Sequence, residues 1–472
     1  MDRRPNRRRP QAPPQAQNPP ANPFGVDNPR AVAYDLATRS IRGTEDFDEI
    51  WHSDSALSRL SQRDRALSIH LAAGVLRRIR RLDAQARQLT DGKYDDLKDP
   101  VKWILRLGLF QVIDCDRIPP HAAVSTAVDA AKTVAHQGIA GLVNAVLRRA
   151  SREKDELRAA ETAPHTEGSE LVHWGERLSM PDWLVETLFN RYGNERPDRI
   201  ERWANSPPSY YFRIAQGVDP ELVLKMIAER ELGSARVHPE FHNYISVATS
   251  ALTVGSPLFS GAHGWVQNPA AGLVIELLDP QPGETVLDLF AAPGGKTLAI
   301  SERVGPNGQA LAVDKSEKRV ERILENKLRL GYTNILPIVA DVTGLGDRRA
   351  MRILADAPCS ALGTLPKNPE VRWTKTPADI TRLARSQRIW LAAASTHVAP
   401  GGVLVYSTCT ITTQENEHIV EAFLSEHPEF TLEPAHQWVN HKYVTPAGYV
   451  STRPPEDGLD GVFAARMRRS AS

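Results

Sequence analysis

The second half of the chain, from about residue 263, consists of short apolar segments that each precede a helical pattern. These segments are 285–289, 310–314, 335–339, 353–356 and 402–406. Parallel strands need long crossover connections, usually helices, so this alternation is typical of a parallel sheet covered on both faces. The sequence therefore predicts an α/β, Rossmann-like domain over residues 263–472.

Polar side chains occur where the predicted strands end. Asp288, Asp314, Asp341, Asp356 and Cys409 each lie at or just past the end of a strand. Ligands of open α/β sheets bind beyond the carboxyl ends of the strands. We therefore expect these side chains to converge on one cleft.

The first half of the chain is predicted to be mainly helical. Residues 26–155 carry apolar side chains at helical spacing, as in Ile69, Ala73 and Leu76, which predicts an all-α domain. Residues 151–170 are charged, lack an apolar period and are interpreted as a linker. Residues 1–25 combine arginine with proline and are expected to form a disordered tail.

Residues 171–262 are expected to form a small α+β module that contributes to RNA recognition. They contain a tryptophan-bearing helix and the strand-like segment 210–214. Tyr210, Tyr211 and Phe212 in that segment could stack on bases. Strand aromatics more often belong to the core, and we favour that interpretation.

Charge and cysteine content limit the partners and the compartment. Residues 61–154 hold 17 Lys and Arg against 10 Asp and Glu, a basic excess that fits either a phosphate-binding face or a solvated helical face. The chain has no apolar run long enough to cross a membrane and no signal-peptide core at its start. Three cysteines, an odd number, favour free thiols in a reducing compartment, so we expect a cytoplasmic protein.

A turn of small residues follows the first strand of the α/β domain. Ala291, Ala292, Pro293, Gly294, Gly295 and Lys296 lie between that strand and a helix, where small residues let the backbone approach a ligand. The turn is neither a G-x-G-x-x-G fingerprint nor a complete P-loop, which argues against ATP hydrolysis. Asp314, about 20 residues after Gly294, can accept both ribose hydroxyls of a nucleoside-like cofactor. Asp341 can accept an adenine amino group, or it can cap a helix.

Two cysteines lie in loops where α/β enzymes expose reactive residues. Cys359 belongs to the segment Asp-Ala-Pro-Cys-Ser and Cys409 to Tyr-Ser-Thr-Cys-Thr. Reactive thiols are the favoured interpretation, and buried packing cysteines are the alternative. The residues alone leave open which thiol would attack a substrate. Cys115 has no partner motif and is expected to be structural.

These motifs together resemble the RNA cytosine-C5 methyltransferases of the Nop/Sun (NSUN) family. The resemblance covers the second half of the chain, including Glu415-Asn416 and the segments 368–373 and 460–463. Phe290 is a departure, because the family often has cysteine at this position. The segments 119–124 and 143–148 resemble the NusB-like RNA-binding domain.

The resemblance implies S-adenosyl-L-methionine as the cofactor and a covalent mechanism. Cytosine C5 is a weak nucleophile, so a thiolate first adds to C6. By resemblance, Cys409 is the nucleophile, Cys359 assists release and Asp356 contacts base N3. The cofactor contacts implied in the same way are Phe290, Ala291, Ala292, Pro293, Gly294, Gly295, Lys296, Asp314, Asp341 and Asp356.

The expected partner is RNA, and the NusB-like domain favours 16S ribosomal RNA. We expect a monomer that uses no metal. The alternatives are cytosine-C5 methylation of tRNA or another rRNA site, and a noncatalytic NusB-like RNA-binding or antitermination factor. An amino methyltransferase is disfavoured, because those enzymes place Asn or Asp-Pro-Pro-aromatic where this chain has Asp-Ala-Pro-Cys.

Overall fold

The computed structural model describes residues 22–26, 28–43, 47, 50, 55–162, 170–252 and 256–471. Most of the expected tail, residues 1–21, lies outside this part of the chain. The end of that segment is ordered against the first helix, since Asn22 Nδ2 donates to Ala31 O at 2.6 Å and Phe24 packs against Tyr34.

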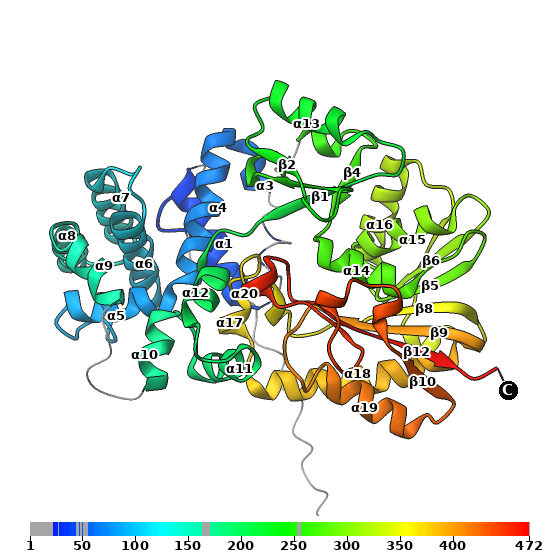
Figure 1. The fold of residues 1–472 in the computed structure, drawn as a ribbon. Helices are drawn as coiled ribbons and strands as arrows, with labels where there is room; N and C mark the ends of the chain where they lie inside the picture. Colours follow the sequence, from blue (N-terminus) through cyan, green and yellow to red (C-terminus); the bar gives the residue numbers. More distant parts are fainter. Residues whose placement is uncertain are drawn as a thin grey trace, which may run out of the picture.

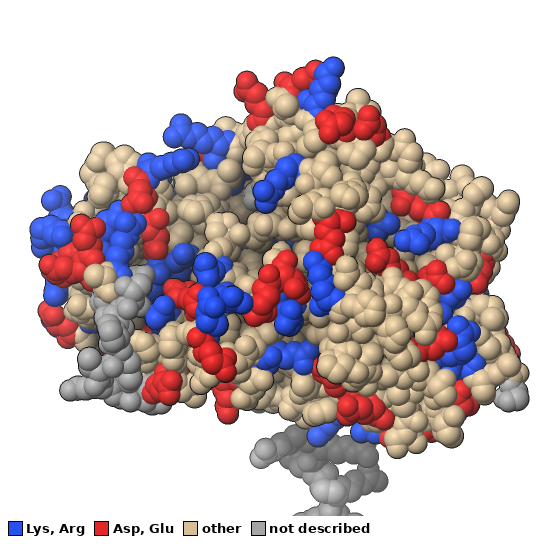
Figure 2. Space-filling view, viewed as in Figure 1, with Lys and Arg blue, Asp and Glu red and all other residues tan. Residues whose placement is uncertain are grey.

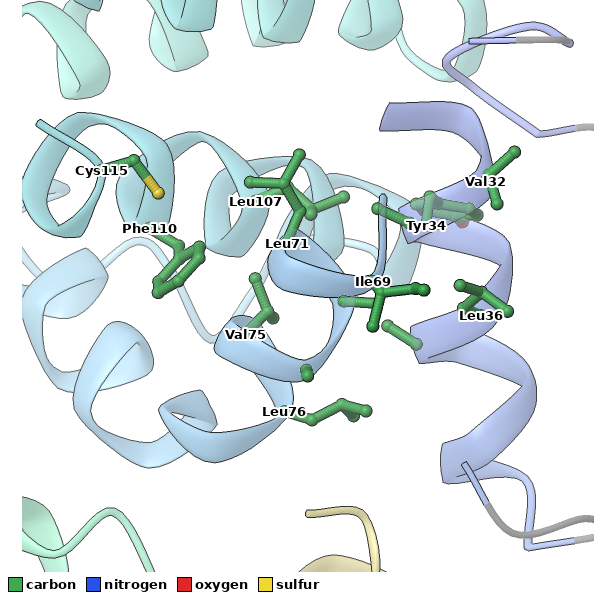
Figure 3. Packing of buried hydrophobic residues seen from close by; sticks show 14 of the residues in the cluster. Val32, Tyr34, Leu36, Ile69, Leu71, Val75, Leu76, Leu107, Phe110 and Cys115 are labelled. Carbon is green, nitrogen blue, oxygen red and sulfur yellow. The ribbon is translucent and has the colours of Figure 1, made fainter. Parts of the chain in front are cut away.

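The expected all-α domain is present at the left of Figure 1. Its apolar side chains meet in one core, where Leu71, Val75, Leu107 and Phe110 point toward one another (Figure 3). Cys115 is buried in this core and burial raises the pKa of its thiol to about 12, in keeping with a structural role. The helices are α1 (Pro29–Ile41), α3 (Ser55–Arg59), α4 (Gln62–Arg77), α5 (Ile79–Leu89), α6 (Asp99–Asp114), α7 (Pro120–Val134), α8 (Gln137–Arg152) and α9 (Lys154–Thr162).

Helix α9 occupies part of the expected linker, residues 151–170. Leu157, the apolar residue of this helix, is 4% exposed and joins the helical core. Lys154 and Arg158 both contact Asp116. One buried leucine and two ion pairs hold this helix. A single large apolar side chain gives no helical period in the sequence, so the sequence could not predict this helix.

The expected module 171–262 is divided in the structure. Helices α10 (Glu170–Arg177), α11 (Asp182–Tyr192) and α12 (Pro197–Asn205) share a core with Leu362, Leu365 and Ile411 of the α/β domain. A small sheet of order β2-β3-β1-β4 packs with α13 (Pro220–Glu229) against the core of the helical domain. Its strands are β1 (Tyr210–Ile214), β2 (Ala235–Val237), β3 (Tyr244–Val247) and β4 (Gly264–Val266), so the sheet extends past residue 262 because β4 pairs with β1. Tyr210, Tyr211 and Phe212 are all buried, which confirms that they belong to the core.

The α/β domain contains the predicted sheet. Strands β5 (Thr285–Leu289), β6 (Gln309–Asp314), β7 (Ile335–Val339), β8 (Ala350–Asp356) and β9 (Val398–Thr408) are parallel, in the order β7-β6-β5-β8-β9. Their apolar sequences follow from burial on both faces. Helices α14 (Pro269–Leu278), α15 (Gly295–Val304) and α16 (Glu317–Leu330) cover one face, while α18 (Pro377–Thr396) and α19 (Glu417–Glu426) cover the other (Figure 1).

The sheet is mixed, not wholly parallel as expected. Strand β12 (Phe463–Arg469) pairs antiparallel with β9 and with β10 (Phe430–Glu433), and β11 (Val450–Ser451) pairs antiparallel with β12. Arg466 of β12 is buried and donates to Glu433 Oε2 at 2.6 Å, so this strand carries a charged pair where an apolar run would be expected. The strand order reverses at β5, because β6 lies on one side of it and β8 on the other, and such a switch point creates the crevice where ligands of these sheets bind.

A short helix of the α/β domain, α17 (Val371–Thr374), joins the parts of the protein. Arg372 is fully buried, and its guanidinium donates to Arg77 O at the end of α4, to Ala204 O of α12 and to Asn205 Oδ1. Trp373 Nε1 donates to Leu76 O at 2.7 Å. The helical domain is therefore held to the segment that follows Cys359.

The basic residues of segment 61–154 are largely paired within the protein. Asp114 contacts Arg78 and Arg81, Asp83 contacts Arg106, and Asp95 contacts Arg87. Figure 2 shows basic and acidic side chains interleaved over this part of the surface. Among the described helices, none is long and apolar enough to cross a membrane.

Candidate active site

The turn after β5 is held at both of its ends. Asp288, the buried fourth residue of β5, accepts a hydrogen bond from Thr297 Oγ1 at 2.5 Å, and burial raises the pKa of Asp288 to about 7. Gly294 has φ of +104°, a conformation that favours glycine, and α15 begins at the next residue. Arg319 Nη2 donates to Ala292 O at 2.8 Å, which fixes the middle of the turn.

A pocket beside this turn lies at the carboxyl ends of β5, β6 and β7. Phe290, Asp314, Asp341, Pro358 and Trp390 all line it, and Phe290 packs against Trp390 with ring centroids 5.3 Å apart. The pocket therefore combines aromatic walls with two carboxylates, as a nucleoside would require.

The two carboxylates of the pocket differ in their partners. Asp314 Oδ1 accepts from Ser316 N, whereas Asp314 Oδ2 is buried and accepts no hydrogen bond within the described residues, although Arg319 Nη1 lies 3.2 Å away. An unused buried acceptor is costly unless a ligand supplies the donor, which fits a ribose hydroxyl. Asp341 accepts from Thr343 N and Oγ1 as the N-cap of a 3₁₀ turn, and these bonds lower the pKa of Asp341.

The two loop cysteines lie together at the end of β8 and β9. The Sγ atoms of Cys359 and Cys409 are 3.3 Å apart, and both side chains are partly exposed. The hydrogen bond with Cys409, together with burial, raises the pKa of the Cys359 thiol well above its usual range. Close thiols cannot readily share two negative charges, so one of them keeps its proton.

Lys296 and Asp356 form an ion pair next to the thiols. Lys296 Nζ lies 2.6 Å from Asp356 Oδ2, and Ser407 Oγ donates to Asp356 Oδ1 at 2.6 Å. Burial lowers the pKa of Lys296, but the negative charge of Asp356 raises it by more. Cys409 raises it further, so the net effect is a raised pKa of Lys296. Lys296, predicted as part of the cofactor turn, is thus directed to the thiol side of Asp356.

Glu415 is fully buried and holds both cysteine loops in place. Its carboxylate accepts from Ser360 N at 2.9 Å and from Ser360 Oγ at 2.6 Å, on the Cys359 loop. It also accepts from Thr410 Oγ1, Thr412 Oγ1 and Gln387 Nε2. Asn416 donates to Thr410 O at 3.0 Å. Together these bonds fix the separation of Cys359 and Cys409.

Comparison with known sequences assigns the family. A profile of the 16S rRNA methyltransferase RsmB/F family matches residues 275–468, and a profile of the NusB family matches residues 28–152. The probable ribosomal RNA small subunit methyltransferase B of Synechocystis is 34% identical over 455 residues, which cover 93% of this chain and 99% of that protein. The chain belongs to the RsmB/F methyltransferase family. The ribosomal RNA small subunit methyltransferase B of Cronobacter sakazakii is 33% identical over 79% of this chain and 85% of its own length.

Solved structures show the same fold as this RsmB/F family member. The crystal structure of PH0851 aligns with a TM-score of 0.74 at 23% identity, covering 93% of this chain and 99% of that one. The structure of NSun6 from Pyrococcus horikoshii with SFG aligns with a TM-score of 0.54 at 22% identity, covering 62% of this chain and 98% of that one. These likenesses confirm the predicted fold class, an N-terminal NusB-like helical domain and a C-terminal Rossmann-like methyltransferase domain.

An RsmB/F methyltransferase uses S-adenosyl-L-methionine, and the residues that line this pocket have the chemistry to bind parts of that cofactor. The unused Asp314 Oδ2 suits the ribose, Asp341 lies at the pocket edge, and Phe290 and Trp390 supply apolar walls. Within the described residues, no group of three or more His, Cys, Asp or Glu side chains could hold a metal ion.

Sequence reasoning missed two features of this site. It did not pair Lys296 with Asp356, which are 60 residues apart in the chain. It also predicted no separate role for Glu415 and Asn416, which belonged only to a motif. Their short distance from Cys409 in the chain was the available indication that they hold the Cys409 loop in place.

Proposed function

We propose that this protein methylates C5 of a cytosine in 16S ribosomal RNA, in the cytoplasm, through a covalent bond between a cysteine and C6. The observation that carries the proposal is the pair of thiols 3.3 Å apart beside the Lys296–Asp356 ion pair. Two adjacent thiols suit a reaction that requires both attack on the base and its later release. The names of the ribosomal RNA small subunit methyltransferase B relatives support the choice of RNA.

In the proposed first step, Cys409 attacks C6 of the cytosine as a thiolate. Its sulfur forms the new bond to C6, and the electrons of the C5–C6 double bond move toward N3. Asp356 is the residue that we assign to N3, where it shares a proton as negative charge develops. Its ion pair with the Lys296 ammonium group, which the raised pKa of Lys296 keeps protonated, can supply that proton. This makes C5 nucleophilic.

Cys359 is the proposed release residue. Its raised pKa keeps the Cys359 thiol protonated, and a protonated thiol in contact with the Cys409 sulfur suits the release step. After C5 has been methylated, the C5 proton passes to a water molecule, the electrons of that C–H bond restore the C5–C6 double bond, and the bond between the Cys409 sulfur and C6 breaks. The sulfur leaves as a thiolate that a hydrogen bond from the Cys359 thiol stabilises, and N3 returns its proton to Asp356.

S-adenosyl-L-methionine, when bound, supplies an electrophilic methyl group. We assign its binding to Phe290 and the turn 291–296, with Asp314 at the ribose and Asp341 at the adenine. Pro358, the residue before Cys359, lines this pocket, so the methyl donor and C5 would meet at the loop that carries Cys359.

Bisulfite mapping of ribosomal RNA from cells that lack the protein tests the proposal. One cytosine of 16S rRNA that resists bisulfite conversion in wild-type cells is expected to be converted in cells that lack the protein. It should resist conversion again when the wild-type gene is returned. Loss of protection only in tRNA, or at another rRNA site, would support those alternatives. No change at any site would favour the noncatalytic factor.

Two cysteine variants test the roles of the thiols. Cys409→Ala is expected to abolish methylation, whereas Cys359→Ala allows the thiolate to add and stalls release. A denaturant-resistant RNA adduct should therefore form with Cys359→Ala and not with Cys409→Ala. The opposite pattern would reverse the two assignments.

A further inference from the structure

A surface groove beside the thiols has no part in the chemistry proposed above. Helix α12, the loop 206–209 and α20 (Pro454–Asp457) line it, and the last two residues before Gly461 complete the wall. Helices α12 and α20 lie side by side near the centre of Figure 1. The groove has a volume of about 540 Å³, which is within the range of roughly 300–1000 Å³ typical of ligand sites.

The wall of this groove is attached directly to the Cys409 segment. Gly461 N donates to Gly363 O at 2.8 Å, and Gly363 N donates to Cys409 O at 3.0 Å. A Cβ atom at Gly363 would overlap both Gly461 O and Cys409 O, so these three segments are in backbone contact. Two successive backbone hydrogen bonds therefore separate the groove wall from the backbone of Cys409, a span of at most about 10 Å if each step is as wide as the spacing of paired strands. A nucleotide adjacent to a cytosine held at Cys409 would reach the groove.

The lining of the groove suits a flat apolar ring. Half-buried Trp203 and a set of prolines provide rigid apolar surface, since proline fixes its own backbone. Bases that leave a stack are commonly held on such surfaces in single-stranded RNA recognition. The prolines are Pro207, Pro208, Pro366, Pro454 and Pro455.

The polar groups of the groove are mostly paired, which leaves little net charge. Asp460 lies 2.6 Å from Lys367, and Glu456 faces Arg199 at 4.0 Å. Arg202, exposed at the rim, pairs with Asp198. A near-neutral groove of this kind suits a base better than a run of phosphates.

One side chain can read the base edge. Asn268 Oδ1 is committed, because it accepts from Ala270 N as the N-cap of α14 and from Asp460 N. Its amide nitrogen faces no partner among the described residues and can donate to a base acceptor.

From these observations we infer that the groove binds the base of an unpaired nucleotide next to the target cytosine and so sets the sequence context of methylation. The inference rests on the proposed function, because it requires an RNA substrate at Cys409.

Filling the groove tests this inference. Ser209 lines the groove and is exposed, so Ser209→Trp blocks the space without removing a core contact. Ser260→Trp, an exposed serine outside the groove, is the matched control. The probe is a synthetic RNA hairpin that carries the cytosine found by bisulfite mapping. Loss of one stacked base predicts a Kd about 5- to 150-fold higher for Ser209→Trp, with kcat at saturating RNA and the cofactor Kd unchanged.

A second variant tests the base contact. Asn268→Asp keeps the capping oxygen and removes the amide donor, so it should change the preference among hairpins that differ only in the nucleotides beside the cytosine. An RNA Kd for Ser209→Trp equal to that of Ser260→Trp, with an unaltered preference for Asn268→Asp, would overturn the groove site. If bisulfite mapping finds no such cytosine, the proposed function itself falls, whereas these variant results with a hairpin that the wild-type protein methylates overturn the groove site alone, which separates the two failures.

Discussion

The sulfur atoms of Cys359 and Cys409 lie 3.3 Å apart, although 50 residues separate them in the chain. Each thiol comes from the loop after a different strand, β8 or β9, and Glu415 ties the two loops together. Their proximity is therefore built by the sheet and by one buried carboxylate.

Mild oxidation should join the two thiols reversibly. With hydrogen peroxide, two thiols give one disulfide and two molecules of water, and sulfurs already in contact need only a small movement to bond. We expect methylation to stop and to return with dithiothreitol, and mass spectrometry should find the loss of two hydrogen atoms in linked peptides. Cys115→Ala should behave like the wild type. Continued activity with both thiols unmodified would contradict this prediction.

Removing the charge of Lys296 should impair chemistry more than cofactor binding. Lys296→Met leaves Asp356 without its cation, so kcat should fall by about 10²- to 10⁴-fold, the usual contribution of a proton-transfer group. Single-turnover methyl transfer measures this loss, and calorimetry measures the cofactor Kd. Asp314→Asn is the comparison, and it should weaken cofactor binding because it alters the unused acceptor. A raised cofactor Kd with normal kcat for Lys296→Met would limit the role of Lys296 to cofactor binding.

Glu415 should behave as a positioning residue. Glu415→Gln keeps the shape of the side chain but replaces one carboxylate oxygen with an NH₂ group. This group cannot accept the hydrogen bonds from Ser360 or Thr410, so the two loops should separate. Activity should fall at least tenfold with an unchanged cofactor Kd, and the free energy of unfolding should fall by about 2–3 kcal/mol. Urea unfolding measures the latter. Glu421→Gln, an exposed change on α19, which begins two residues after Glu415, is the control. Equal activity of the two variants would remove Glu415 from this role.

The stability of the α/β domain should depend on pH through Asp288. Its pKa is raised to about 7 in the folded protein, against roughly 3.9 in an unfolded chain. Between these values the folded state holds a proton that the unfolded state has lost, so the free energy of unfolding should fall as pH rises, by up to about 1.4 kcal/mol per pH unit, and level off above pH 7. Asp288→Asn should lack this contribution. Thermal unfolding of both proteins from pH 5 to 8 measures it, and parallel profiles would argue against a raised pKa.

The parallel half of the fold could be predicted from the sequence. Strands buried on both faces have continuous apolar sequences. The predicted limits 285–289 and 335–339 therefore agree with those of β5 and β7 in the structure. Short motifs also located both thiols and the turn of small residues after β5, because the chain places them after strand ends.

The remaining features depend on contacts between distant segments. Strand β12 contains buried Arg466, whose charge is neutralised by Glu433, and a pattern of apolar residues cannot show such a pair. The ion pair between Lys296 and Asp356 joins the start of α15, which follows β5, to the end of β8, and these become neighbours only when β5 pairs with β8. The division of residues 171–262 between two cores has the same origin, because α10–α12 find their apolar partners beyond residue 360.

The buried guanidinium of Arg372 has a genetic consequence. The loop that carries Cys359 continues into α17, and Arg372 binds backbone carbonyls of α4 and α12. A substitution that disturbs the docking of the helical domain would therefore also displace the loop that carries a reactive sulfur. A truncated chain without that domain would leave the Arg372 guanidinium uncovered. A random screen for lost methylation should recover substitutions in α4 and α12, far from any reacting atom.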